Sequence, residues 1–229
     1  MKRVFLAHTA LFIVNLIYAL NYTIAKDVMP YYIEPSGFIL LRVLGGVFLF
    51  LIFYVFFINE RVDKKDYFSF ALCGLFGDAI NQLFFFEGLI LTTPINAAII
   101  MTTNPILVIV ISAFLIGEKI TPQKVLGIFF GIVGAGTLIL NSGSISFDNN
   151  FFIGNILVFI NATSYAIYLV LVKGLMKKYQ PLTVMFFVFL FGLFFVFPFG
   201  YQQLTSIDIE LFSRDIYLKV LFVVICTTF

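Results

Sequence analysis

The sequence predicts an all-α polytopic membrane protein, and three observations support that fold class. Of the 229 residues, 62% are hydrophobic and only 11% are charged, whereas soluble domains are about 45–50% apolar and about 25% charged. Several apolar runs exceed the roughly 18 residues that mark a transmembrane helix. The runs are continuously apolar rather than alternating, and they are about twice as long as a barrel strand, so helices are favoured over an outer-membrane barrel.

Eight spans can be drawn along the chain, joined by short connections. Their expected bounds are residues 5–25, 36–58, 67–90, 94–117, 122–141, 152–172, 182–201 and 216 to the end. Prolines punctuate the connections, at Pro30, Pro35, Pro94, Pro122 and Pro181. The first span mimics a signal peptide, but it has no small-residue cleavage pattern and more spans follow, so we expect it to be retained.

Basic residues are concentrated in alternate connections. They lie at the N-terminus and after the second, fourth and sixth spans: Lys2, Arg3, Arg61, Lys64, Lys65, Lys119, Lys124, Lys173, Lys177 and Lys178. The other connections carry only Lys26 and Arg214. Because cytoplasmic loops are enriched in Lys and Arg, we expect a cytoplasmic N-terminus in a cell membrane, taken to be a bacterial inner membrane.

Short motifs recur in the two parts of the chain at nearly equal offsets. YALNYTIAK at Tyr18–Lys26 is echoed by YAIYLVLVK at Tyr165–Lys173. Two further pairs follow at offsets within two residues of the first, Glu34-Pro35 with Gln180-Pro181 and Asp66-Tyr67 with Asp215-Ile216. Three matches in the same order, at offsets of 146–149 residues, indicate an internal repeat.

The repeat unit, about 147 residues long, holds five helices. Because five is an odd number, the second copy enters the membrane from the opposite side. Such inverted repeats build many secondary transporters. Residues 1–145 would form the first unit, and residues 150–229 would begin the second. Because the last apolar run has no polar tail, we expect the sequence to be truncated within the third helix of the second unit. The intact protein would then have ten helices, of which about eight are present here.

Four consecutive motifs point to a known family. PSGFILLRVLGG places an arginine early in the second span, and FFFEGL ends the third. TTPINAAIIMTTNPILVIVISAFLIGEKIT is a proline-split fourth span with a Gly-Glu-Lys link, and the glycine-rich KVLGIFFGIVGAGTLIL follows. The stretch from Pro35 to Leu140 thus resembles an EamA domain of the drug/metabolite transporter superfamily, and residues 152–229 look like the first half of a second copy. The resemblance implies a ten-helix inner-membrane transporter, often an exporter of amino acids or other small metabolites.

The third span carries a polar stripe near the middle of the membrane. Gly74, Asp78, Asn81 and Phe85 have helical spacing, and Gln82 flanks them. A carboxylate at this depth costs roughly 2.5–3.5 kcal/mol, so Asp78 should face a water-filled cavity or a partner. We expect these polar residues to bind substrate and take Asp78 as the candidate for proton coupling. A structural hydrogen bond to a neighbouring helix is the alternative.

Two other charged residues lie near this stripe. Glu87 follows Asp78 by nine residues, half a turn around the helix and nearer the outer surface, so we expect it at the interface. Arg42 lies one to two turns inside the outer end of its span. We expect Arg42 to snorkel to the interface; pairing with Asp78, Glu87 or an anionic substrate is the alternative.

Three further spans have polar residues suited to a central cavity. The substrate-binding candidates outside the third span are Asn15, Tyr18 and Tyr22 in the first span, Thr103 in the fourth, and Asn161, Tyr165 and Tyr168 in the sixth. The alternative is that these polar residues only pack between helices. Pro105 frees a carbonyl one turn back and is a candidate hinge, with a tolerated bend as the alternative.

Several classes of function are excluded. The single histidine, His8, provides neither a His-rich metal site nor a base for a serine hydrolase, so we expect no enzyme, no metal and no cofactor. Scattered basic residues argue against nucleic acid, and no phosphate-binding loop is present. The prediction is therefore a secondary transporter with alternating access, whose partners are a small-molecule substrate and the bilayer. A non-transporting scaffold or subunit is the alternative, and the oligomeric state is left open, with a homodimer as one option.

Overall fold

The computed structural model describes residues 2–58, 60–141, 149–208 and 212–228, and the regular structure in these ranges is helical. The elements are α1 Lys2–Val28, α2 Pro35–Phe57, η1 Lys64–Asp66, α3 Tyr67–Gly74, η2 Leu75–Ala79, α4 Ile80–Leu91, α5 Pro94–Met101, α6 Asn104–Ile116, α7 Pro122–Asn141, α8 Asn149–Leu175, α9 Pro181–Thr205 and α10 Arg214–Cys226. The predicted all-α fold class is confirmed.

The helices coincide with the predicted spans to within a few residues. Within the described ranges, six helical segments are long and apolar enough to cross a membrane, which confirms a polytopic membrane protein. The other two predicted spans correspond to α7, of 20 residues, and α10, of 13 residues. The predicted division between units, at residues 145–150, falls partly on residues 142–148, which lie outside the described residues.

Local sequence explains where the helices begin and end. The prolines predicted to punctuate the connections open α2, α5, α7 and α9, where the missing N–H leaves no helical hydrogen bond unmade. The Thr93 side chain caps α5 by accepting a hydrogen bond from the Asn96 amide at 3.1 Å. Gly117 ends α6 in the left-handed region, with φ +65°, which glycine adopts without a steric penalty.

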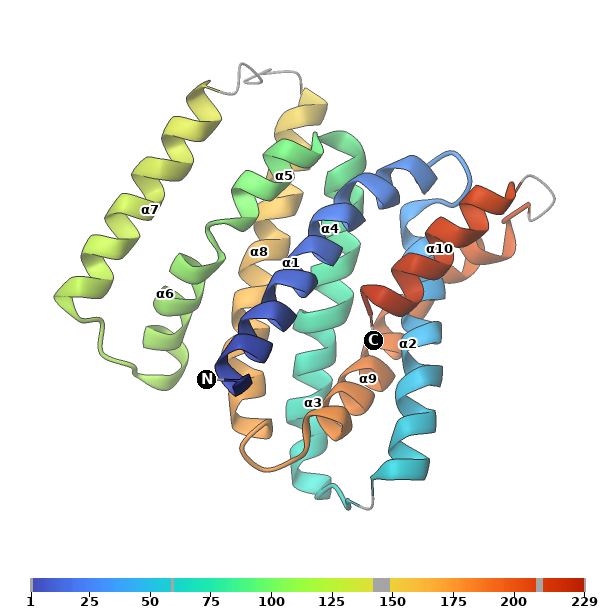
Figure 1. Cartoon of the computed structure of the whole chain (residues 1–229), viewed down its shortest axis with the longest axis horizontal. Helices are drawn as coiled ribbons and strands as arrows, with labels where there is room; N and C mark the ends of the chain where they lie inside the picture. The colour runs from blue at the N-terminus through green and yellow to red at the C-terminus, as the bar shows by residue number, and fades with distance from the viewer. Residues whose placement is uncertain (1, 59, 142–148, 209–211, 229) are drawn as a thin grey trace.

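Helices from the two predicted units run in opposite directions and pack against one another. In Figure 1, α1 rises where α8 descends, and α2 descends where α9 rises. α2 packs along α9, and α4 packs along α8. Their contact faces form one apolar core, in which Phe38 and Leu40 of α2, Phe86 of α4, Val158 of α8 and Val196 of α9 are all buried.

Two of the spans are interrupted near mid-length. Between α3 and α4 the chain forms the π-helical turn η2, in which the Ile80 amide donates to the Leu75 carbonyl five residues back. Between α5 and α6 the helix breaks at Thr102 and Thr103. Both interruptions lie beside the cavity described below.

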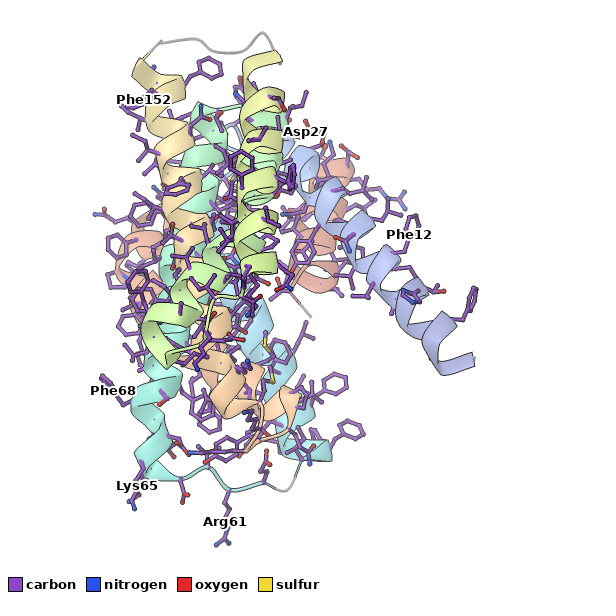
Figure 2. The ribbon with its side chains drawn as sticks, turned by 90° about the vertical axis from the view of Figure 1, so that its left-hand side faces the viewer. Phe12, Asp27, Arg61, Lys65, Phe68 and Phe152 are labelled. Carbon is purple, nitrogen blue, oxygen red and sulfur yellow. The ribbon has the colours of Figure 1, made fainter. Side chains whose placement is uncertain are left out.

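The outermost helices present apolar side chains to their surroundings. α1 leans away from the rest of the bundle in Figure 2, where Phe12 points outward and is 70% exposed. In Figure 1, α7 lies at the edge of the bundle, and Phe129 and Phe130 on it are exposed. Such surfaces suit lipid rather than water, in keeping with a multi-pass membrane protein.

Candidate functional site: a central polar cavity

A cavity of about 440 Å³ is lined by residues of α1, α2, η2, α4, α5, α6, α8 and α9 and by Thr227 and Thr228. Its volume is in the range of small-molecule sites. Nine of the ten predicted substrate-binding residues line it: Asn15, Tyr18, Tyr22, Asp78, Asn81, Gln82, Asn161, Tyr165 and Tyr168. The polar stripes predicted on the first, third and sixth spans therefore converge on one cavity.

Aromatic rings form much of the wall. Tyr22 of α1 meets Phe85 of α4 edge-on, with ring centroids 5.3 Å apart. On α8, the Tyr165 and Tyr168 rings lie 5.9 Å apart. Tyr168 packs so closely on η2 that a Cβ at Gly77 would lie 2.4 Å from its ring. These rings provide apolar faces, and the tyrosines add hydroxyl groups.

Asp78 lies on the π-helical turn η2, at the cavity wall. Its side chain is 2% exposed, and Oδ2 has no hydrogen-bond partner among the described residues. The carboxyl group reaches α9 at Gly192, where a Cβ would lie 2.2 Å from Oδ2. Because buried polar groups are normally hydrogen-bonded, a bare carboxylate oxygen here is suited to receive a proton or a donor group of a ligand.

Like Asp78 Oδ2, three amide oxygens in the cavity wall are buried without a hydrogen-bond partner among the described residues. In the described part of the chain, the Oδ1 atoms of Asn21, Asn104 and Asn161 are buried without a partner, and all three residues line the cavity. The orientation of Asn161 is fixed, because its Nδ2 donates to the Asn81 carbonyl at 2.6 Å. All four unpartnered atoms accept hydrogen bonds, so the wall is complementary to a ligand with several N–H or O–H donors.

Arg42 lies in the cavity wall, and the prediction that it snorkels to the interface is wrong. Its side chain is 6% exposed. Nε donates to Thr228 Oγ1 and Nη1 to Gln82 Oε1, both at 2.8 Å, while Nη2 donates to the Thr227 carbonyl at 3.3 Å. The other two of its five N–H groups have no protein acceptor among the described residues. These partners, from α4 and from the residues that follow α10, stabilise the guanidinium within the bundle, so it does not extend to the surface.

The cavity therefore has both signs of charge. Arg42 and Asp78 are the charged side chains among its described lining residues, and they form no ion pair with each other within 4 Å in the described structure. The site can thus offer a cation to one end of a ligand and a carboxylate to another. Among the described residues, no cluster of three His, Cys, Asp or Glu side chains could hold a metal.

Hydrogen bonds hold α8 against the interrupted third span. Ser164 Oγ of α8 donates to the Phe76 carbonyl within η2 at 2.6 Å. Together with the bond from Asn161 to the Asn81 carbonyl, it satisfies backbone on both sides of Asp78. Backbone groups at membrane depth must be satisfied by protein or water, so these bonds from α8 help to stabilise the π-helical turn that presents Asp78.

The fourth span contributes to the cavity through residues next to those predicted. Thr103 does not line the cavity, and its hydroxyl donates to the Ile100 carbonyl at 2.7 Å. Met101 and Asn104, on either side of the break, do line it. Pro105 lies in the first turn of α6, directly after the break. The predicted interruption is present, and hinge motion at Pro105 stays a prediction.

Glu87 lies apart from Asp78, as predicted, and its place at the membrane interface stays a prediction. It does not line the cavity. Ser36 Oγ at the start of α2 donates to Glu87 Oε1 at 3.2 Å. The two acids of the third span therefore have different surroundings.

Replacing Arg42 with lysine should destabilise the fold. An ammonium group cannot make the three divergent contacts of the guanidinium, and each hydrogen bond to a charged group contributes about 1.5–3 kcal/mol. We expect Arg42→Lys to lower the thermal unfolding midpoint of the purified protein in detergent. The exposed Arg61 provides the control, because Arg61→Lys should leave the midpoint unchanged. Equal midpoints for the two variants would contradict the structural role of Arg42.

This chain matches a family model and is similar to several known proteins. The model of the EamA-like transporter family matches residues 5–140 and again residues 152–229. The uncharacterized transporter YyaM of Bacillus subtilis (strain 168) is 28% identical over 176 residues, which are 75% of this chain and 57% of YyaM. An uncharacterized transporter of Archaeoglobus fulgidus is 25% identical over 204 residues, 88% of this chain and 69% of that protein.

A solved protein structure also resembles this chain. It superimposes with a TM-score of 0.61 at 19% identity, covering 94% of this chain and 75% of the other. At that identity the likeness is one of fold. The chain spans little more than half the length of YyaM.

Proposed function

Because the chain belongs to the EamA-like transporter family, we propose that it carries small metabolites such as amino acids across the cytoplasmic membrane as a secondary transporter. Export is the proposed direction, and substrate binds in the central cavity. Helices of the two units then rock to expose the cavity alternately to either side. Protonation of Asp78 couples the cycle to a proton gradient.

The observation that supports this proposal is the chemistry of the cavity. An amino acid carries an ammonium group, which suits Asp78 and the unpartnered amide oxygens of Asn21 and Asn161. Its carboxylate suits the two remaining N–H groups of Arg42. The aromatic wall at Tyr22, like the tyrosines of α8, suits an apolar side chain. Both charge signs within one small cavity match a zwitterion better than a purely apolar solute.

Two features support the proposed architecture of ten helices in two inverted units. The family model matches the chain twice, at residues 5–140 and 152–229. The helices of the two stretches run in opposite directions, as α1 and α8 do in Figure 1. A cytoplasmic N-terminus in a bacterial inner membrane is proposed from the basic connections, of which Arg61 and Lys65 lie at one end of the bundle (Figure 2).

The test is transport by the purified protein in proteoliposomes, against a panel of radiolabelled amino acids and other small metabolites. We expect at least one solute to exchange faster than in protein-free liposomes. Gly77→Leu should abolish that exchange, because its side chain would displace Tyr168 into the cavity. Gly127→Leu is the matched control, since a Cβ at Gly127 meets no described atom within 4 Å. If no solute in the panel moves, transport is contradicted and a scaffold role is favoured. Equal exchange by the two variants would contradict the cavity as the place where substrate binds.

A further inference from the structure

One end of the bundle is closed by polar contacts between two connections that lie far apart in the sequence. One connection joins α2 to α3 and includes residues 60–66; the other joins α8 to α9 and consists of residues 176–180. Figure 2 shows Arg61 and Lys65 at this end, with Asp27 and Phe152 toward the other. The first connection belongs to the first family match and the second to the second, so the contacts join the two proposed units.

Asp66 is the centre of these contacts. Lys178 Nζ donates to Asp66 Oδ1 at 2.8 Å, and the Tyr179 hydroxyl donates to Oδ2 at 2.7 Å. The same hydroxyl accepts from the Asp63 amide at 3.1 Å. The hydrogen bond that Lys178 donates to Asp66 raises the pKa of Lys178 above its ordinary value, so the ammonium stays charged at neutral pH. Both carboxylate oxygens of the buried Asp66 are thus bonded to the other connection.

Glu60 provides a second attachment. Its carboxylate accepts from the Gln180 amide at 3.1 Å and from the Thr183 hydroxyl at 2.5 Å, in the first turn of α9. A carboxylate at a helix N-terminus is stabilised by the free N–H groups and the helix dipole. The Tyr54 hydroxyl donates to the Glu60 backbone carbonyl at 2.7 Å and holds it from α2.

An apolar layer separates these polar contacts from the central cavity. Phe70 and Cys73 of α3, Val172 of α8 and Val184 of α9 are buried together. The layer continues to Tyr168 and Val188, which line the cavity, and to Tyr179, which bonds Asp66. A solute leaving the cavity at this end would therefore have to part the apolar layer and then the bonded connections.

We propose that the contacts of Glu60 and Asp66 with residues 178–183 form a latch, and that the latch and the apolar layer together are the gate at this end of the translocation path. The gate is closed in this structure, and it opens when the two connections separate. This proposal rests on the transport function proposed above for the cavity. It adds the contacts that must break for substrate to pass.

The reactivity of Cys73 tests the latch without any transport measurement. Cys73 is fully buried in the apolar layer, and Cys226→Ser leaves it as the single cysteine. The readout is the rate at which a small charged methanethiosulfonate modifies Cys73 in the full chain in nanodiscs, where both faces are accessible. Asp66→Ala should raise this rate about tenfold, which corresponds to about 1.4 kcal/mol of lost stabilisation.

Smaller changes should give smaller effects. Lys178→Ala removes an ammonium that is 60% exposed, and should raise the rate about threefold, because exposed ion pairs contribute little. Tyr179→Phe removes one hydroxyl and should also raise the rate, so the proposal can be tested even if Asp66→Ala fails to fold. The double exchange Asp66→Lys with Lys178→Asp should return the rate toward that of the parent.

The control breaks an ion pair at the opposite end of the bundle. Lys219 Nζ lies 3.2 Å from Asp27 Oδ2, and Asp27→Ala should leave Cys73 unreactive. Latch variants that react no faster than Asp27→Ala would overturn the proposal. Faster reaction in a protein that moves no solute would support the latch and contradict transport, so the two proposals fail separately.

Discussion

Asp78→Asn should abolish solute movement driven by a pH gradient and leave the protein folded. The amide has nearly the shape of the carboxylic acid but cannot bind or release a proton. Asp78 is buried, and Oδ2 lacks a partner among the described residues, so no ion pair is lost by the change. Since an ionised carboxylate at this depth costs roughly 2.5–3.5 kcal/mol, the variant should be at least as stable as the parent. Accumulation would fall to the level seen without a gradient.

The measurement uses proteoliposomes with an imposed pH gradient, and exchange without a gradient is followed in parallel. Glu87→Gln is the matched control. It neutralises the other acid of the third span, which lies outside the cavity and bonds Ser36, so it should keep gradient-driven accumulation. Full accumulation by Asp78→Asn would show that Asp78 does not couple transport to protons. An equal loss of accumulation in Glu87→Gln would show that coupling does not depend on a carboxyl group in the cavity.

Gly74→Leu should prevent stable packing of the third span against α9. A Cβ at Gly74 would lie 2.7 Å from the Gly192 amide nitrogen and 2.8 Å from the Val188 carbonyl oxygen. Both atoms are backbone, so neither can rotate away and the helices must separate. Overpacking of this kind costs about 1–3 kcal/mol for small additions and more for large ones. We expect little monodisperse protein after extraction in detergent, and a markedly lower unfolding midpoint for what remains.

Gly127→Leu makes the same change on α7, where the position is exposed. Removing a glycine from an open helical position gains about 1 kcal/mol of helix propensity, so this variant should be as stable as the parent or more so. Equal yields and midpoints for the two variants would contradict the close approach of α3 and α9.

The spans and most of the cavity could be predicted because both depend on local patterns. Hydrophobic runs define the helices, and helical spacing groups Asn15 with Tyr18 and Tyr22, which together line the cavity. Spacing alone does not say how far a face extends. Asn21 is adjacent to the predicted Tyr22 and is the more deeply buried of the two, because packing of α1 against its neighbours, not its sequence, sets its rotation.

Features that depend on distant partners could not be predicted. The partners of Arg42 come from α4 and from Thr227 and Thr228, about 185 positions along the chain, and nothing near Arg42 indicates them. In the fourth span, the sequence also did not indicate which residue beside the break lines the cavity. Its break was predicted, but a local hydrogen bond to Ile100 occupies the Thr103 hydroxyl, and Asn104 reaches the cavity instead.

The π-helical turn at Leu75–Ala79 has a consequence for comparing this chain with its relatives. A turn closed over five residues contains one residue more than an α-helix needs to join the same two flanks. A relative whose third span is a regular α-helix would therefore lack one residue at this point. Its sequence would align correctly only with a single-residue gap inside a membrane span, where alignments normally allow none. Without that gap, the alignment would be in register on only one side of Asp78. The residue of the relative that is aligned with Asp78 would then lie on another face of the helix.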